Sequence, residues 1–302
     1  MTAKVFIDGE AGTTGLQILE RLQGRADITL VQVEHERRKD ADARAEAFAK
    51  ADVAILCLPD AAAIEAVSLA GDCRIIDAST AHRVADDWVY GMPELPGQAE
   101  AIAGASRVAN VGCYATGSIA LIRPLRDAGL LSETDALVLT GTSGYTGGGK
   151  ALIAEYDAGT APAYFLYATG QTHKHVPEIM RYGRLTRQPA FQPAVGNYAQ
   201  GMIVQLHLHR DAMAGAPDMA ALEEAFRAFY ASARFVDVVP APARLDARAM
   251  NGTNRMEISV HGSDETGIMT VTATLDNLGK GASGTAVQNL NLMIGAPEDA
   301  GL

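Results

Sequence analysis

Short apolar runs alternate with helical patterns through the first third of the chain, and this alternation restricts the fold more than any other sequence feature. Continuous apolar runs are typical of parallel strands that helices cover on both faces. Strands separated by helices imply right-handed crossovers, so the pattern predicts the α/β class, with a doubly wound parallel sheet of the Rossmann type. The expected strands are residues 5–8, 28–34, 53–58 and 74–79, and the expected helices are 16–25, 41–50 and 61–70.

The pattern changes after about Cys113, and a chain of 302 residues has room for a second domain. Residues 202–209 and 256–261 alternate apolar and polar side chains, as half-buried antiparallel strands do, and 267–275 is similar. Asp218 is placed to cap a helix that follows it. We therefore expect an α+β domain after the parallel sheet.

Charge and cysteine content exclude several classes of protein. The formal net charge is −11, and an acidic chain repels the phosphates of nucleic acids. The three cysteines are odd in number and form no C-x-x-C pair, which is typical of a reducing compartment. The chain opens on a strand-like run rather than a signal sequence, and no apolar stretch approaches the roughly 18 residues of a membrane span. We expect a cytoplasmic protein without nucleic-acid or membrane partners.

A glycine-rich turn joins the first expected strand to the first helix. Its spacing is G-x-x-G-x-x-G rather than the commoner G-x-G-x-x-G, but strand–turn–helix is the context that a dinucleotide site requires. Glycine lets the backbone approach a pyrophosphate, and the helix start offers N–H groups to it. The alternative is a tight turn without a ligand. The turn predicts a cofactor site formed by Gly9, Gly12, Thr13, Thr14 and Gly15.

Charged residues after the second strand bear on the choice of cofactor. Glu34 lies where an acidic residue would bind a ribose 2′-hydroxyl and favour NAD. Arg37, Arg38 and Lys39 follow at once and can neutralise a 2′-phosphate. We therefore predict NADP, with Arg37 and Arg38 as contacts, against the alternative of a solvated charged loop.

Cys113 lies between an apolar strand and an apparent helix. The positive end of a helix dipole favours the thiolate, which makes this cysteine a candidate nucleophile. Cys57 and Cys73 lie in or beside apolar runs, where a buried filler is the better interpretation.

His173 and His175 lie just before a helix that Pro177 is suited to begin. One of them is a candidate general acid or base near the thiol. A metal site is the rival hypothesis, but the sequence offers no clear third and fourth ligand, so we predict none. Surface histidines on a loop are the remaining alternative.

Two further motifs suggest anion contacts. Residues 144–150 resemble the P-loop motif of ATPases. The motif requires a Ser or Thr that binds Mg²⁺ at the next position, but residue 151 is Ala, so an ATPase is disfavoured. Arg83 is a candidate anion clamp because a guanidinium fits a carboxylate or phosphate, although a surface arginine is an equal alternative. Ser79 ends an expected parallel strand, where cofactors bind in such sheets.

Six segments together resemble the N-acetyl-γ-glutamyl-phosphate reductase family, in its shorter bacterial form. The resemblance runs from residue 4 to about 294, and it rests on residues 9–15, 77–83, 90–95, 111–116, 173–178 and 276–291. The family's usual proline before Gly-Cys is Val111 here, and Glu10 replaces a small residue of the first turn.

The resemblance implies NADPH-dependent reduction of N-acetyl-L-glutamyl 5-phosphate to the 5-semialdehyde, with phosphate release, in arginine biosynthesis. It also implies a catalytic domain of the semialdehyde and glyceraldehyde-phosphate dehydrogenase kind, which usually pairs into a homodimer or homotetramer. The expected domains are residues 1–113 for the cofactor, 114–278 for catalysis and dimerisation, and 279–302 as a helical segment that returns to the first domain.

Site roles follow from the same resemblance. The Cys113 thiolate would attack the acyl phosphate to give a thioester, His175 would be the acid or base, and His173 would orient the substrate. The substrate contacts are expected at Arg83, Ser143, Gly144, Lys150 and Gln200, and Asn289 is expected at the nicotinamide end of the cofactor.

Two alternatives stay open at this point. A related dehydrogenase would act on another small acyl phosphate, since several enzymes share this architecture. A Rossmann-type sensor would bind a nucleotide without turnover, but it would have no need of an activated cysteine beside a histidine pair.

Overall fold

The computed structural model describes residues 2–302, which divide into two compact units. The first unit contains the residues up to Gly112 together with Ala282–Leu302, and the second unit contains Cys113–Gly281. The first unit is therefore built from both ends of the chain, and the second is inserted between them.

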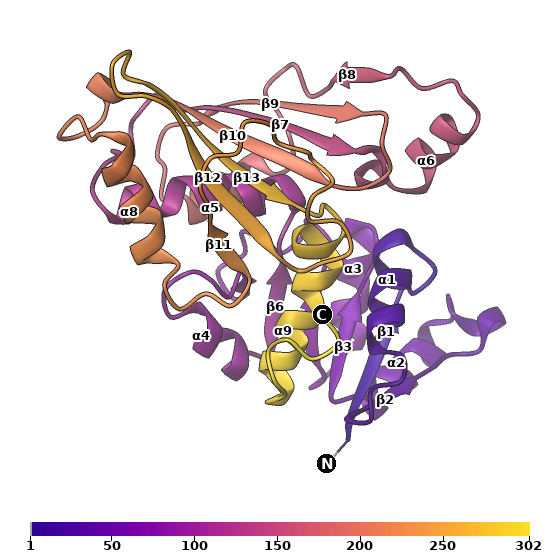
Figure 1. The fold of residues 1–302 in the computed structure, drawn as a ribbon. Coiled ribbons are helices and arrows are strands. Elements are labelled where there is room, and N and C mark those ends of the chain that lie inside the picture. The colour runs from indigo at the N-terminus through magenta and orange to yellow at the C-terminus, as the bar shows by residue number, and fades with distance from the viewer. Residues whose placement is uncertain (1) are drawn as a thin grey trace. The chain divides into compact units, whose positions relative to one another are not determined.

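The first unit contains a parallel sheet, which confirms the predicted fold class (Figure 1). In the described residues its strand order is β2-β1-β3-β4-β6-β5, and every neighbouring pair is parallel. All the carboxyl ends thus lie at one edge, and the order reverses between β1 and β3, where such sheets bind ligands. The strands are β1 (Ala3–Asp8), β2 (Ile28–Val31), β3 (Val53–Leu56), β4 (Arg74–Asp77), β5 (Val89–Gly91) and β6 (Arg107–Asn110).

Helices cover both faces of this sheet. The helices are α1 (Thr13–Leu22), α2 (Ala41–Lys50), α3 (Asp60–Leu69), α4 (Gln98–Gly104) and α9 (Gly284–Ile294). Val5 and Ile55 pack with side chains of α1, α4 and α9, whereas Phe6 packs with side chains of α2 and α3. Successive strand residues therefore point into different cores, which explains why these strands are apolar throughout.

The expected second strand, residues 28–34, was too long. β2 ends at Val31, and Glu34 precedes the short 3-10 helix η1 (His35–Arg37). Residues 34–39 are exposed, and all but His35 carry a formal charge, so they gain nothing from burial in a sheet.

The second unit contains a mixed sheet with the order β11-β12-β13-β10-β7-β9-β8 among the described residues (Figure 1). β7 with β9 and β11 with β12 are parallel pairs, and the other neighbours are antiparallel. The strands are β7 (Val138–Gly144), β8 (Tyr164–Leu166), β9 (Ala190–Gly196), β10 (Met202–His209), β11 (Val236–Val238), β12 (Met256–Ser263) and β13 (Ile268–Leu275).

One face of the mixed sheet is covered by helices. The helices of this unit are α5 (Cys113–Asp127), α6 (Gly149–Asp157), α7 (Val176–Tyr182) and α8 (Met219–Phe229). Short helical segments are η2 (Tyr145–Gly148) and η3 (Arg210–Ala212), and η4 (Gly279–Ser283) spans the end of this unit and the return to the first. α5 lies so close to β10 that a Cβ on Gly117 would stand 2.6 Å from Val204 Cγ2. As predicted, the Asp218 side chain caps α8, accepting a hydrogen bond from the amide of Ala221.

Part of the opposite face of the mixed sheet is exposed within the described chain. His207 and His209 of β10 are exposed and alternate with buried residues that face α5. Their cross-strand partners are Val138 of β7 and Ile268 of β13, which are 45% and 54% exposed. We call these four residues the open-face group.

Candidate active site

The glycine-rich turn lies at the carboxyl end of β1, beside β3. Gly9 has a φ of +90°, and a Cβ there would stand 2.4 Å from the carbonyl oxygen of Cys57. A Cβ on Gly15 would stand 2.6 Å from the carbonyl oxygen of Gly9. Neither position accepts another residue without rearrangement, so the backbone is held in a tight turn.

The start of α1 offers unpaired N–H groups toward this turn. The residue before the helix is Gly12, which supplies no side-chain cap, and the first turn contains no acidic residue. The amides of Thr13, Thr14 and Gly15 have no acceptor within the helix. Glu10 is exposed. This set of groups fits the pyrophosphate of a dinucleotide.

Arg37 and Arg38 are exposed on the loop after β2, the strand next to β1. Arg37 Nη2 lies 3.4 Å from Asp40 Oδ1, and Arg38 Nη1 lies 3.0 Å from the ring nitrogens of His35. Both guanidinium groups are therefore at the surface, where the predicted contact with a 2′-phosphate requires them.

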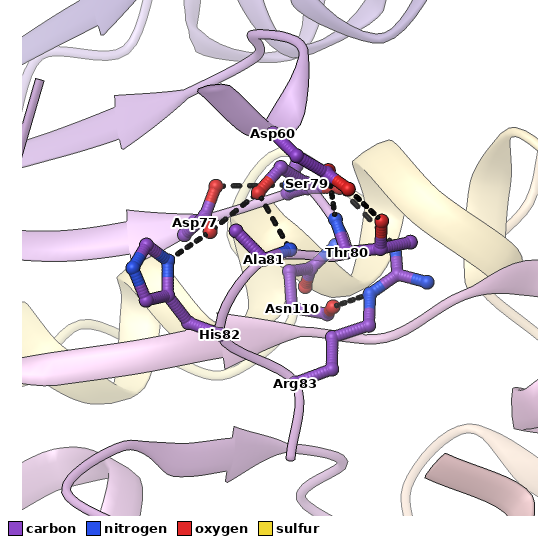
Figure 2. A network of polar contacts seen from close by, with 9 residues as sticks. Asp60, Asp77, Ser79, Thr80, Ala81, His82, Arg83 and Asn110 are labelled. Carbon is purple, nitrogen blue, oxygen red and sulfur yellow. Dashed lines mark hydrogen bonds and ion pairs between the residues drawn. The ribbon is translucent and has the colours of Figure 1, made fainter. Parts of the chain in front are cut away.

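The loop after β4 is held by a buried carboxylate, as Figure 2 shows. Asp77 accepts hydrogen bonds from the amide of Ser79 at 2.9 Å and from its hydroxyl at 2.7 Å. The Nδ1 atom of His82 lies 2.7 Å from the same carboxylate, and the His82 ring stacks on Trp88. Ser79 is thus fixed at the edge of the sheet where the strands end.

Arg83 is buried, and its guanidinium is bound by backbone carbonyls. Nε donates to the carbonyl of Asn110 at 2.9 Å (Figure 2), and Nη2 donates to those of Ala78 at 3.2 Å and Val111 at 3.3 Å. Arg83 therefore fixes the segment that leads into Cys113. The anion contact expected from the sequence stays a prediction.

Asn289 of α9 is fully buried beside the ends of β5 and β6. Its Nδ2 donates to the carbonyl of Gly91 at 3.1 Å and to Oδ1 of Asn110 at 3.0 Å. Its own Oδ1 is buried without a hydrogen-bond partner among the described residues. The contact of Asn289 with the nicotinamide end of the cofactor stays a prediction.

Cys113 begins α5 and is partly exposed. Cys57 is also partly exposed, although a buried filler was expected, and Cys73 is buried as expected. Desolvation, reinforced by the carboxylates of Asp77 and Asp8, raises the pKa of Cys57 to about 12, and burial raises the pKa of Cys73 to about 11. Only Cys113 combines a helix start with exposure, as nucleophilic cysteines do.

His173 and His175 are both buried rather than displayed on a surface loop. The amide of His175 donates to Nδ1 of His173 at 3.1 Å, and His173 Nε2 lies 3.2 Å from the hydroxyl of Tyr167. Burial, with a smaller contribution from Lys174, lowers the pKa of His173 to about 4. His175 Nε2 lies 4.0 Å from Oε1 of the buried Glu178, within ion-pair range.

The ring of Tyr114 links the nucleophile's helix to both histidines. Its centroid lies 5.7 Å from the ring of His173 and 6.1 Å from the ring of His175. Its hydroxyl donates to the carbonyl of Ala194 at 2.6 Å, and Gly141 leaves room for it, because a Cβ there would stand 2.8 Å from the ring. The residue after Cys113 therefore packs against the histidine pair.

Three of the expected substrate contacts lie together in the second unit. Ser143 and Gly144 end β7, and the amide of Gly144 donates to the carbonyl of Gly201, next to Gln200. Gln200 is half-buried, and its Nε2 donates to Asp276 Oδ2 at 2.5 Å. Lys150 lies on the exposed first turn of α6 instead.

Sequence reasoning missed several residues of this site. Glu178 follows His175 by three positions on a helix, a spacing that could have indicated the pair. Tyr167 gave no local signal, because a tertiary contact brings it to His173. Asp276 and Gly281 lie in the segment 276–291 that carries the resemblance, but they were assigned no site role. Asp276 contacts Gln200, and a Cβ on Gly281 would stand 2.7 Å from Cys113 Cβ.

Two features are absent from residues 2–302. No group of three or more His, Cys, Asp or Glu side chains there is arranged to hold a metal ion. No helix in that range has the length and apolar character needed to cross a membrane.

The comparisons first define the class of protein. The chain matches two family models, "Semialdehyde dehydrogenase, NAD binding domain" over residues 4–105 and "Semialdehyde dehydrogenase, dimerisation domain" over residues 113–277. Aspartate semialdehyde dehydrogenase II from Vibrio cholerae shares the fold, with a TM-score of 0.74, 16% identity and coverage of 97% and 98% of the two chains. The enzyme from Francisella tularensis has a TM-score of 0.73, 14% identity and coverage of 97% and 100%. Fold and domains define a nicotinamide-dependent oxidoreductase of the semialdehyde dehydrogenase class.

Sequence relatives narrow the class. Proteins named N-acetyl-gamma-glutamyl-phosphate reductase from Brucella suis and Brucella canis are 50% identical to this chain, over 98% of it and 100% of their own length. The chain belongs to the N-acetyl-gamma-glutamyl-phosphate reductase family.

Proposed function

We propose that this chain reduces N-acetyl-L-glutamyl 5-phosphate to N-acetyl-L-glutamate 5-semialdehyde with release of phosphate, a step of arginine biosynthesis, and that NADPH is the reductant. The name shared by relatives that are half identical over the full length is the observation that carries this proposal. A partly exposed cysteine at a helix start, on the same unit as two buried histidines, supports it.

The cofactor is assigned to the first unit. Gly9, Gly12, Thr13, Thr14 and Gly15 would hold the pyrophosphate, Ser79 and Asn289 would lie toward the nicotinamide end, and Arg37 and Arg38 would neutralise a 2′-phosphate. A structural neighbour from Candida albicans, with a TM-score of 0.70, was solved with NADP. When bound, the reduced nicotinamide supplies the hydride that brings the acyl group to the aldehyde level.

Cys113 is the proposed nucleophile. Its thiolate would attack the acyl carbon, the sulfur–carbon bond would form, and the carbon–oxygen bond to phosphate would break, leaving a thioester and inorganic phosphate. The N–H groups at the start of α5 would stabilise the negative charge that develops on the carbonyl oxygen. The same thiolate leaves again when the aldehyde is expelled.

The two histidines would have different tasks. His173 accepts a backbone N–H at Nδ1, so its neutral ring carries the proton on Nε2. With a pKa near 4 it stays neutral at pH 7, and we assign to it the orientation of the substrate. His175 faces the carboxylate of Glu178, a pairing that orients a general acid or base, so we assign the proton transfer to His175.

The substrate's charged groups would be met by Arg83, Lys150, Ser143 and Gly144, and Gln200 would meet the acetamido group. A guanidinium or ammonium pairs with phosphate or carboxylate, and small residues at the end of β7 let an oxygen-rich group approach the backbone.

We propose assembly of the second unit into a homodimer or homotetramer through the open-face group, since this unit matches a dimerisation domain. Exposed apolar residues beside polar ones are typical of such contacts. The three cysteines carry free thiols, which supports a cytoplasmic, reducing setting.

A spectrophotometric assay tests the function. Purified protein is mixed with NADPH and N-acetyl-L-glutamyl 5-phosphate, and the loss of nicotinamide absorbance is followed. Cys113→Ala should lower kcat by at least ~10³-fold, because the covalent step is lost. Cys73→Ala should retain most of the wild-type kcat. Turnover of aspartyl phosphate instead would point to a related dehydrogenase, and full activity of Cys113→Ala would exclude both enzymatic readings.

A further inference from the structure

The loop that follows β13 contains a fully buried carboxylate, Asp276, whose oxygens are all engaged. Oδ1 accepts a hydrogen bond from the amide of Leu278 at 2.9 Å. Oδ2 accepts from the amide of Gly252 at 2.8 Å and from Nε2 of Gln200 at 2.5 Å. This carboxylate therefore joins three separate loops of the second unit.

The carboxylate also fixes which way the amide of Gln200 is turned. A carboxylate oxygen accepts hydrogen bonds and cannot donate one, so it must face the NH₂ of Gln200 rather than its oxygen. Oε1 of Gln200 is then the atom left for a ligand, and it accepts no hydrogen bond from the described part of the chain. Gln200 is half-buried, so part of the side chain remains accessible.

The same loop is connected to the nucleophile. The carbonyl of Asp276 accepts a hydrogen bond from the amide of Gly281 at 2.9 Å, and Gly281 packs directly against Cys113. Asn277, the next residue, accepts a hydrogen bond from the amide of Gly201 at 2.7 Å. Gln200 and Cys113 are therefore connected through Asp276 and Gly281.

We infer that Asp276 is a positioning residue that presents Oε1 of Gln200 as a hydrogen-bond acceptor for the N–H of the substrate's acylamino group. This inference rests on the proposed function, and it names the residues that would select the substrate. The enzyme would prefer an acyl phosphate that carries a secondary amide over one that lacks it, since the latter leaves Oε1 unpaired when it binds.

Binding of stable ligands tests this without turnover. Isothermal titration calorimetry compares N-acetyl-L-glutamate with glutarate, which lacks the acylamino group. Gln200→Leu should weaken the binding of N-acetyl-L-glutamate by ~10-fold, because one hydrogen bond is lost. The affinity for glutarate should stay within ~2-fold of the wild-type value. Gln188→Leu, at an exposed position, is the matched control and should change neither.

A double-mutant cycle tests the role of Asp276. Asp276→Asn should produce the same selective loss as Gln200→Leu, and the double variant should bind no worse than either, because the two residues act as one unit. In Gln200→Leu the rate of Cys113 alkylation by iodoacetamide should stay within ~2-fold of the wild-type rate.

The possible failures are distinguishable. Equal weakening of both ligands by Gln200→Leu, no weakening of either, or a wild-type protein that binds neither ligand would overturn the inference. Selective binding of N-acetyl-L-glutamate by a protein that does not reduce the acyl phosphate would overturn the proposed function alone.

Discussion

At the scale of single residues, glycines that lack a side chain shape the site as much as the reactive side chains do. Gly9 and Gly15 leave the backbone of the cofactor turn without side chains, and Gly281 leaves room for the Cβ of Cys113. In each case a methyl group would stand less than 3 Å from another atom, so the glycine is required by contact rather than by chain flexibility.

The lowered pKa of His173 predicts how stability depends on pH. The folded pKa is near 4 and the usual value is 6.5, so the unfolded chain binds more protons between these values. The contribution to stability is fully present above pH 6.5 and is lost as the pH falls through about 4, with a total near 3 kcal/mol. Urea unfolding of His173→Asn should show a correspondingly flatter loss of stability across this window.

The control for this measurement is His35→Asn, because His35 is exposed in the loop after β2 and lies outside the open-face group. It should preserve the wild-type pH profile. A His173→Asn profile as steep as that of the wild-type protein would contradict the assignment.

Sequence reasoning at this scale depends on how local the signal is. The position of Cys113 at a helix start and the burial of Cys73 follow from neighbouring residues, and the structure has both. The contact of Asp276 with Gln200 joins residues 76 positions apart, and that of Tyr167 with His173 requires a loop conformation. No spacing rule predicts contacts that depend on the packing of distant strands.

At the scale of elements, the hydrophobic period and the length of each helix or strand decided whether it could be predicted from the sequence. β10 has the expected bounds, because eight residues with one clear period leave little choice. β5 and β8 contain three residues each and were not expected, since so short a strand has no period. These strands are defined by their partners β6 and β9.

A buried ion pair joins two elements of the first unit and predicts a large loss when broken. Arg44 of α2 donates to Oδ2 of Asp8, the last residue of β1, and their side chains are 8% and 6% exposed. Burial raises the pKa of Asp8 despite this partner. Arg44→Met should lower the free energy of unfolding by about 3 kcal/mol, because it leaves a buried carboxylate unpaired.

Urea unfolding near pH 7 measures this loss, and adding Asp8→Asn should restore part of it. The comparison is Arg227→Met, which removes an exposed pair with Glu223 and should cost less than about 1 kcal/mol. Equal losses for the two arginines would show that burial is not the cause.

At the scale of the whole molecule, the open-face group predicts the assembly state. Ile268 is exposed on this face, and His209 of β10 is its cross-strand partner. A carboxylate at this position would be buried without a partner on association, so Ile268→Asp should shift the protein toward the monomer in sedimentation-velocity runs. Ile64→Asp, an equally exposed position on α3, should leave the sedimentation coefficient unchanged. An unaltered assembly of Ile268→Asp would place the contact elsewhere.

The interrupted chain path of the first unit has an evolutionary consequence. The side chain of Asn110 donates to the carbonyl of Ala282 at 2.9 Å, so the two cut ends that bracket the insertion already lie together. A linker of a few residues between them would close the nucleotide-binding half into a free-standing protein. Genetic recombination could therefore exchange the inserted half as one cassette and give the same cofactor module a different chemistry.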